Sequence, residues 1–319
     1  SSDSSRGANR PARIKMIAYV GASHARLAAA ISICLVVACG PATADIEALT
    51  LYQKTARATL IARVRALTDS TRRPPMEVLE IFKGSYTPGR LTVVPHFEDH
   101  AQPTPWLKRE VFRRGEESIL FLLPYVDEYG RGEGPEIFSL LNADQGKLMI
   151  PAEGGDALVS ALRTMIEIQA MSPPDRQEQA LRALLSDANP HLVEAAIEEC
   201  LRFRLAEDAD IETLLGLLAH RRPGVRAGAA GLLAQVVRDA RAAQRELPDR
   251  PRLAEKISAA ARLDADEAVR AQTVGALEAL GDSSALALLE AIAKEDSSQK
   301  VRYMAAVAAH GLKSERGSD

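Results

Sequence analysis

The sequence predicts an α+β protein of two domains, in which a small antiparallel β-barrel precedes an all-α helical repeat. Two observations carry this prediction. Between residues 45 and 155, apolar residues alternate with polar ones or form short runs bounded by Gly and Pro, which is typical of strands. From Asp156 onward the apolar residues recur with a helical period, and one short motif returns four times.

Length, charge and cysteine content narrow the function classes. A chain of 319 residues fits two domains. Its net charge of −3 argues against a general nucleic-acid-binding protein, which usually carries a clearly basic face. Two of its three cysteines, Cys34 and Cys39, lie near the N-terminus, so disulfide bonds do not staple the fold. Cys200 falls on an apolar helical face, where a free cysteine behaves as a small hydrophobic residue.

Residues 1–44 form a predicted export leader. Basic residues precede an unbroken apolar run of 12 residues, 27–38, which matches the apolar region of a signal peptide and is too short to span a bilayer. Met16 is a candidate natural start, which would leave a short basic segment before the run. A buried core helix is the alternative, but the basic flank and the small residues after the run favour export.

Two cleavage sites compete in this leader. The stretch Val36–Cys39 resembles the lipobox of bacterial lipoproteins, which implies a lipid on Cys39 and attachment to a membrane. The triplet Ala42–Ala44 instead fits a signal peptidase, which would release a chain beginning at Asp45. We expect the lipoprotein, with Cys39 as the lipidation site and the periplasm or outer membrane as the location. Free secretion is the alternative.

The first domain is predicted to contain five or six antiparallel strands that close a small barrel or pack as a sandwich. In the first strand Leu60, Ala62 and Val64 share one face, while Arg63 and Arg65 share the other. Apolar runs between turn residues predict the rest. The predicted strands cover residues 58–67, 76–82, 91–94, 118–124, 136–141 and 147–150.

The order of these pieces resembles secreted bacterial domains with an OB-like, TIMP/netrin-like barrel. The matching stretches read MEVLEIFKG at 76–84, GEESILFL at 115–122 and QGK at 145–147. The resemblance makes protease inhibition a candidate function. Tissue inhibitors of metalloproteinases, however, bind the protease zinc through a free N-terminal cysteine. Here Cys39 would be acylated and Asp45 has no thiol, so inhibition by that mechanism is not expected.

The best candidate for chemistry is the stretch from His96 to His100, which holds two imidazoles and two carboxylates within five residues. Such a set could bind a divalent metal and support a periplasmic metal-dependent enzyme. Flanking Pro95 and Pro103 favour a solvated loop instead, and no cysteine or second histidine pair reinforces the set. No nucleophile motif is present elsewhere. We therefore expect no catalysis, no bound metal and no cofactor.

Four copies of one motif define the second domain. They occupy residues 189–196, 222–229, 266–273 and 298–305, and an apolar helix is predicted before each copy. The motif valines, separated by 32, 44 and 32 residues, are Val193, Val225, Val269 and Val301. The longer middle interval holds a polar insert, residues 238–252, which we expect to be a solvated loop at one edge.

This helix-turn-helix unit, in which Val-Arg opens the second helix, resembles the HEAT repeat of the PBS-lyase-like kind. The resemblance implies a solenoid in which arginines pair with acids of neighbouring turns and form a ladder. Arg226, Arg270 and Arg302 match that position, whereas Glu194 departs from it and marks the first repeat as a cap. An unrelated helical bundle is the alternative.

The expected organisation is a leader at 1–44, an OB-like barrel at 45–155, a connecting helix and linker at 156–175, and a HEAT-like solenoid of about four repeats at 176–319. Repeat stacks build extended surfaces, which usually bind other proteins. We therefore expect an exported, lipid-anchored, non-catalytic scaffold that binds a protein partner through the solenoid and does not bind nucleic acid.

Overall fold

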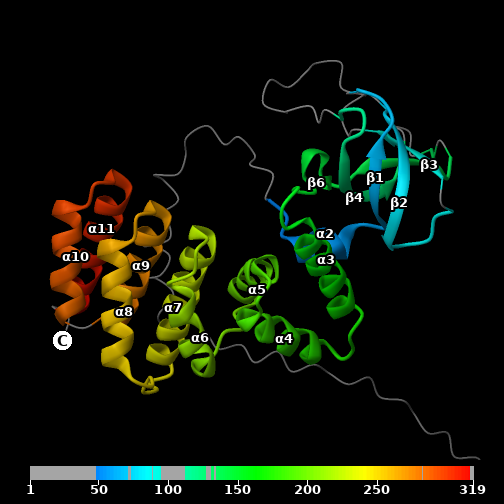
Figure 1. Cartoon of the computed structure of the whole chain (residues 1–319). Helices are drawn as coiled ribbons and strands as arrows, with labels where there is room; N and C mark the ends of the chain where they lie inside the picture. The colour runs from blue at the N-terminus through cyan, green and yellow to red at the C-terminus, as the bar shows by residue number, and fades with distance from the viewer. Residues whose placement is uncertain are drawn as a thin grey trace, which may run out of the picture. The chain divides into compact units, whose positions relative to one another are not determined.

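The computed structural model describes residues 48–70, 73–87, 89–94, 112–126, 131–132, 134–281 and 283–316 (Figure 1). These residues belong to one compact unit that starts at Ala48. The predicted leader with Cys39 and the stretch from His96 to His100 lie outside them. Within these ranges, every helix is too short or too polar to cross a membrane.

Five strands form a closed barrel. Strand β1 pairs antiparallel with both β2 and β4, so the ring β1-β2-β3-β5-β4 returns to β1. Strand β6 pairs with the half of β4 that β5 leaves free. The elements are α2 (Leu51–Arg57), β1 (Leu60–Ala66), β2 (Pro75–Lys83), β3 (Arg90–Val94), β4 (Glu117–Pro124), β5 (Ile137–Leu140), a 3₁₀ turn (Ala143–Gly146) and β6 (Lys147–Met149).

The prediction of an antiparallel barrel is wrong for one pair of strands. Strands β3 and β5 run parallel, with Val93 opposite Phe138. The reason is the route of the chain, because β4 pairs with β1 and leaves the open edge of β3 to a later strand. Strand β5 returns antiparallel to β4 and therefore points in the direction of β3. The barrel is mixed.

Alternation along the strands separates the inside of the barrel from its outside, as the sequence pattern of β1 predicts. The inward side chains of β1 and β4 pack with those of the other strands, and this core holds Leu60, Ala62, Val64, Ala66, Met76, Leu91, Val93, Phe112, Leu120, Leu122, Phe138 and Leu140. The outward Ile61, Ile119 and Phe121 are also 0% exposed. They pack outside the barrel in a cluster that includes Val159 and Leu162 of helix α3.

Helix α3 (Gly155–Gln169) buries two faces at once. Val159 and Leu162 pack with the outward side chains of the barrel. Met165 and Ile168 instead pack with Leu181 and other residues of the first helix pair. A helix that is apolar on two sides must be covered on two sides. Helix α3 therefore belongs to both cores.

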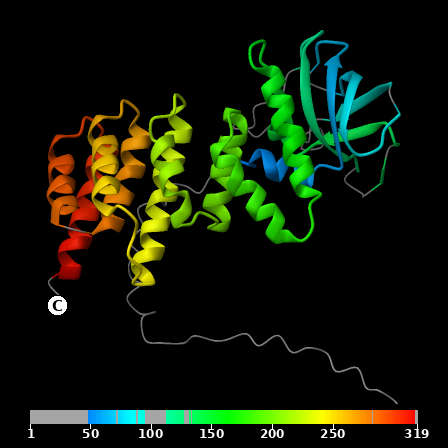
Figure 2. The same ribbon diagram turned by 60° about the horizontal axis from the view of Figure 1, so that its bottom comes forward.

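Four helix pairs follow. Each second helix begins at a motif copy, helix α7 contacts both α5 and α9, and α9 contacts α11. The second helices thus form one layer and the first helices the other, as Figure 2 shows. The pairs are α4 (Pro174–Ala183) with α5 (Pro190–Phe203), α6 (Ile211–Leu217) with α7 (Pro223–Ala242), α8 (Arg250–Leu263) with α9 (Glu267–Leu280), and α10 (Ser283–Glu295) with α11 (Gln299–Arg316); 3₁₀ turns lie at Leu184–Ser186 and Asp208–Asp210.

The motif valines hold this repeat together. Each is at most 2% exposed, and Val193, Val225 and Val301 pack in the helical core. Cys200 lies in the same core, as expected from its helical face. Burial, and then the nearby charge of Asp210, raise the pKa of its thiol to about 12. Since the thiolate is the reactive form, Cys200 is a structural residue.

The predicted solvated loop at residues 238–252 is helical at both ends, which corrects the sequence interpretation. Helix α7 continues to Ala242 and helix α8 starts at Arg250, so the loop spans only residues 243–249. Alanine and arginine favour helix and extend α7. Asp249 caps α8 by accepting a hydrogen bond from the backbone N–H of Arg252. Leu247 packs against the helical core, so the loop is anchored.

Candidate binding surface and the arginine ladder

Two of the three predicted ladder arginines form paired hydrogen bonds with an aspartate of the following repeat. Arg226 donates from Nε and Nη2 to the carboxylate of Asp264, at 2.7 and 2.8 Å. Arg270 makes the same contact with Asp296, at 2.9 and 3.1 Å. The planar guanidinium fits a carboxylate in this two-bond geometry, which fixes orientation as well as distance.

The remaining nitrogen of each guanidinium binds its own repeat. Nη1 of Arg226 donates to the carbonyls of His220 and Arg221, in the turn between α6 and α7. Nη1 of Arg270 donates to the carbonyl of Asp264, whose carboxylate already holds Arg226. Each aspartate therefore joins two successive arginines, and the bonds run continuously from one repeat to the next.

The guanidinium hydrogen bonds also set the protonation of these aspartates. Arg226 lowers the pKa of Asp264, and Arg270 lowers the pKa of Asp296 in the same way. The side chains of Arg270 and Asp296 are only 10% and 6% exposed, so water hardly reaches the pair. These groups stay charged and paired. Their role is to hold neighbouring repeats in register, and they leave no free acid or base for catalysis.

The ends of the ladder differ from its middle. Arg302 donates from Nη1 to the carbonyls of Asp296 and Ser297, and within the described chain its guanidinium has no carboxylate partner. Glu194, which occupies the arginine position of the first repeat, accepts a hydrogen bond of 2.6 Å from Arg222. An ion pair still joins the first two repeats there, but the acid lies on the earlier helix.

The exposed side of the second helices forms a continuous surface. A Cβ placed on Gly231 of α7 would lie 3.3 Å from Leu201 of α5 and 3.6 Å from Gln272 of α9. A Cβ on Gly311 of α11 would lie 3.5 Å from Glu278 of α9. Side chains from adjacent helices thus meet over the glycines. We refer to Leu201, Gly231, Gln272, Glu278 and Gly311 as the second-helix surface.

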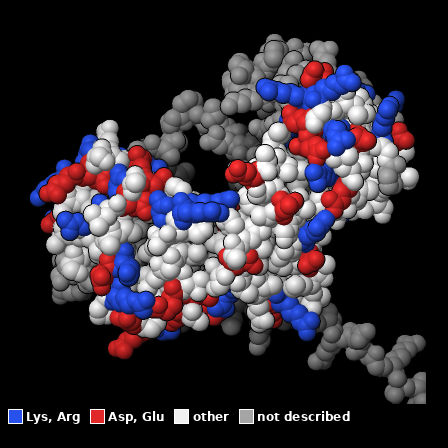
Figure 3. All heavy atoms as spheres, in the orientation of Figure 1, with Lys and Arg blue, Asp and Glu red and all other residues white. Residues whose placement is uncertain are grey.

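Charge on this surface is mixed. Glu278 is exposed, yet surrounding protein atoms partly desolvate its carboxyl, and burial is the main cause that raises its pKa. Arg238 and Arg241 oppose that rise, and Glu315 adds to it. In Figure 3, basic and acidic side chains are interspersed over the visible face of the helical repeat. A partner would therefore meet alternating charges, as in a polar protein interface.

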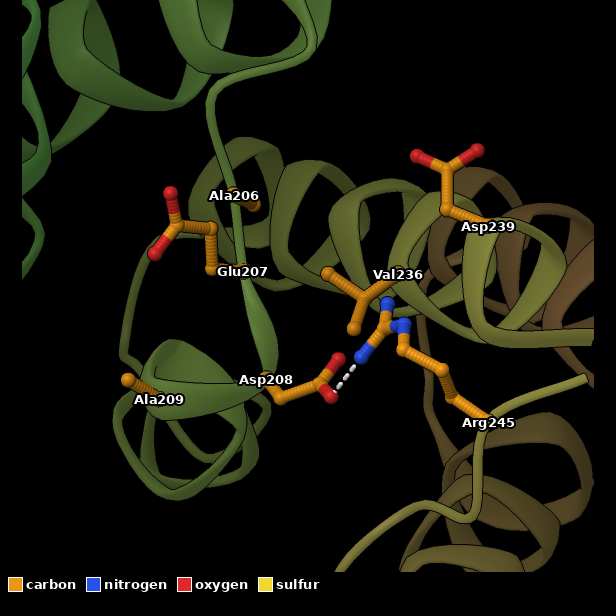
Figure 4. A pocket seen from close by; sticks show the side chains of 7 residues that line it. All are labelled: Ala206, Glu207, Asp208, Ala209, Val236, Asp239 and Arg245. Carbon is orange, nitrogen blue, oxygen red and sulfur yellow. Dashed lines mark hydrogen bonds and ion pairs between the residues drawn. The ribbon is translucent and has the colours of Figure 1, made fainter. Parts of the chain in front are cut away.

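Figure 4 shows a pocket of about 450 Å³ beside the start of α6 and the end of α7. Arg245 points to Asp208 and forms an ion pair with it. The other two acids of the lining point away from that pair, and each has its own partner. Glu207 pairs with Arg182 at 2.8 Å, and Asp239 pairs with Arg204. Each carboxylate of the lining therefore has an arginine partner.

Other predicted sites receive no support from the geometry. Within the described ranges, no three His, Cys, Asp or Glu side chains gather as a metal site would require. The metal-dependent enzyme would use His96 and His100, which lie outside those ranges, as does Cys39. The sequence predicted binding through the solenoid but not the residues of the second-helix surface, because the glycines and alanines of the second helices indicated only close helix packing.

Comparison with known proteins gives a limited result. No protein-family model matches the chain, and no curated protein matches it. Among solved structures, it is similar to a chain in the complex of CpcE and CpcF of phycocyanin lyase from Nostoc sp. PCC7120. The identity is 20% and the TM-score 0.35, and the match covers 47% of this chain and 98% of that chain.

Two engineered proteins are similar to the same extent. A designed armadillo repeat protein in complex with the peptide (KR)4 has 18% identity and a TM-score of 0.34, and the match covers 49% of this chain and 75% of that chain. For a second engineered protein the identity is 18%, the TM-score 0.34 and the coverage 49% and 74%. Likenesses of this size carry no information on activity or ligand.

Proposed function

We propose that this protein is an exported, lipid-anchored scaffold without catalytic activity that binds another protein through the second-helix surface. One observation carries the proposal. The side chains of neighbouring second helices meet over Gly231 and Gly311, so that Leu201, Gln272 and Glu278 form one exposed face across successive repeats. Extended faces of stacked repeats usually bind other proteins. This continuity supports contact with a polypeptide partner.

The partner interface is expected to be polar and salt-sensitive. Glu278 and the arginines beside it carry opposite charges within one area of the second-helix surface. Exposed charges attract a partner over about 10 Å at 0.1 M ionic strength and less at higher salt. Binding that weakens as salt rises from low to physiological concentration would agree with this arrangement.

Site-specific photo-crosslinking tests the binding surface. A photoreactive amino acid at Gln272, which is exposed on α9, should form an adduct with one partner in the native envelope. The matched control is Glu255, which is exposed on α8 in the other layer. The same adduct from both positions, or from Glu255 alone, would place the contact elsewhere and contradict the proposal.

The anchor has its own test. If Cys39 carries a lipid, Cys39→Ser should move the protein from the detergent phase to the aqueous phase, because one acyl-bearing residue supplies the membrane affinity. Cys34→Ser, within the apolar run that precedes Cys39, is the matched control and should partition as the chain with both cysteines does. Unchanged partitioning of the Cys39→Ser variant would favour cleavage after Ala44.

A further inference from the structure

The arginine ladder has one unfilled position, on α11. Figure 2 shows α11 at the end of the row of second helices, and no helix follows it within the described ranges. Nη1 of Arg302 donates to the carbonyls of Asp296 and Ser297, at 2.6 and 3.2 Å. Nη1 of Arg270 donates in the same way to two carbonyls of its own repeat, at 2.9 and 3.2 Å. The two guanidinium groups are therefore anchored alike.

The opposite edge of the guanidinium differs between the two arginines. Nε and Nη2 of Arg270 bind the carboxylate of Asp296 in the following repeat, at 2.9 and 3.1 Å. Nε and Nη2 of Arg302 have no hydrogen-bond partner among the described residues. Because the guanidinium is planar and rigid, its anchoring at Nη1 also directs this free edge. Arg302 is thus oriented for a carboxylate from a further repeat.

Apolar side chains lie exposed on the same helix. Counted from the motif valine, Ala306 of α11 corresponds to Val274 of α9, and Tyr303 corresponds to Ala271. On α9, which α11 contacts, Val274 and Ala271 are 1% and 3% exposed. On α11, Ala306 is exposed, and Tyr303 and Val307 are 59% and 49% exposed. Two positions that are covered on α9 are therefore open on α11.

We infer that α11 binds a helical pair of a partner protein, and that an aspartate of this pair binds Arg302. We call Arg302, Tyr303, Ala306 and Val307 the open face. The aspartate lies in the turn before the second helix of the pair, as Asp296 does here. That second helix packs along the open face as α11 packs along α9. The inference goes beyond the proposed function, because the open face shares no residue with the second-helix surface.

Charge favours such a partner over a second copy of this chain. Residues 302, 306, 309 and 313 share one face of α11. Two copies joined through this face by a twofold axis would place Arg302 opposite Lys313 if the helices ran antiparallel, and opposite its own equivalent if they ran parallel. Lys313 already pairs with Glu290 at 2.6 Å. Neither arrangement brings a free carboxylate to Arg302.

A helical pair of this protein serves as the first probe. A second copy of residues 283–319 is joined after Asp319 of the full chain, so that the copied equivalent of Asp296 can reach Arg302. Circular dichroism should show the added helices. Hydrogen exchange in α11 should slow on the order of tenfold, because the open face becomes covered. Arg302→Ala should remove most of this slowing, whereas Arg262→Ala on the exposed side of α8 should leave it unchanged.

Photo-crosslinking in the native envelope tests for the natural partner. A photoreactive amino acid at Ala306 should form an adduct, and mass spectrometry should place it in a helix that follows an aspartate-bearing turn. Arg302→Ala should reduce the adduct on the order of tenfold. Arg302→Lys should reduce it as well, since an ammonium cannot make the two-bond contact. Arg262→Ala is again the matched control.

The inference is overturned if the added helices do not form or leave hydrogen exchange in α11 unchanged. It is also overturned if Ala306 forms no adduct, if the adduct lies in a second copy of this chain or in a segment without an acid, or if it persists in Arg302→Ala. A crosslink at Gln272 that survives these results would retain the proposed function. Loss of the Gln272 crosslink with an intact Ala306 adduct would contradict only the second-helix surface.

Discussion

The barrel and the helical repeat reach stability by different routes. In the barrel, segments far apart in the sequence pair directly, so that Arg63 of β1 lies opposite Ile119 of β4. In the repeat, successive second helices contact each other, and Arg226 and Arg270 reach forward by one repeat. A closed ring forms as a whole, whereas a stack gains stability from each neighbouring interface.

This difference predicts how far the effect of a destabilising substitution should extend in each region. A defect in the ring is expected to loosen every strand, because no strand of a closed barrel has a free edge. A defect in the stack is expected to stay near the altered repeat. Helix α3 touches both systems through separate faces. It therefore allows the two responses to be compared within one helix.

The largest expected effect comes from α3. Leu162→Ala and Met165→Ala each remove a side chain that is 0% exposed, at a cost of about 2–5 kcal/mol. Hydrogen exchange followed by mass spectrometry should show faster exchange throughout the strands for Leu162→Ala. For Met165→Ala the increase should centre on α4 and α5. Identical exchange maps would show that the two regions unfold as one unit and would break the comparison.

The next effect concerns the ladder. Arg270→Ala leaves the buried Asp296 carboxylate without its two-bond partner and should cost about 3 kcal/mol. Arg302→Ala removes only bonds to carbonyls and should cost about 1 kcal/mol. Urea denaturation measures both. Equal losses would mean that the aspartate pairing adds nothing to the repeat.

The same pairs predict the acid response of the repeat. The pKa values of Asp264 and Asp296 are lowered in the folded state. Their contribution is therefore complete above the unfolded-state pKa of about 3.9 and is lost as pH falls through the folded-state values. Because Arg270→Ala removes the partner of Asp296, the stability of this variant should fall less steeply as the pH is lowered. A thermal melting series from pH 6 to about pH 2 provides the check, and an unchanged slope would contradict the pairing.

Substitution of two glycines by alanine should change the stability of the protein in opposite directions. A Cβ on Gly228 of α7 would lie 2.2 Å from Cγ2 of Ile197, so Gly228→Ala should push α5 away and cost about 1–3 kcal/mol. Gly275 of α9 has no atom within 4 Å of such a Cβ, so Gly275→Ala should stabilise the helix by about 0.5–1 kcal/mol. The denaturation midpoints of both variants test this prediction. If both midpoints shifted in the same direction, close packing of α7 against α5 would not explain the effect at Gly228.

A similarly small effect is expected at Glu199. Burial raises the pKa of its carboxyl, although the hydrogen bond from Thr50 partly opposes the rise. The folded state therefore favours the protonated form, and stability falls as pH rises through that raised pKa. Glu199→Gln keeps an acceptor for Thr50 and should be about 1 kcal/mol more stable near pH 7. The gain should vanish below the unfolded-state pKa of about 4.3. Melting curves at both pH values test it, and a gain that persists in acid would refute the charge explanation.

Local patterns in the sequence predicted the elements well. Alternation at Leu60, Ala62 and Val64 identified both the first strand and its inward face. The helix pairs followed from periodicity, because the motif valines recur at fixed offsets. Both signals arise within a few residues, where side-chain direction depends on the local backbone alone.

Which distant segments of the chain contact each other was not predictable from such local patterns. The parallel pairing of β3 with β5 depends on where β4 goes, and no residue of either strand encodes that route. The HEAT-like resemblance implied that acids of neighbouring turns pair with the arginines, but it did not single out Asp264 and Asp296, which look like ordinary turn residues. The insert was misread because its charges obscured good helix formers up to Ala242. Contacts between distant segments required the structure.

The two covered faces of α3 constrain how such a chain could be recombined. Val159 and Leu162 match the outside of this barrel, while Met165 and Ile168 match the first helix pair. In a chimera joined before α3, a foreign barrel would not match Val159 and Leu162 and would leave them exposed. In a chimera joined after α3, a foreign repeat would leave Met165 and Ile168 exposed. An exchange of the barrel or of the repeat would therefore also require new side chains on the face of α3 that packs against the exchanged domain. Helix α3 thus couples the sequences of the two domains.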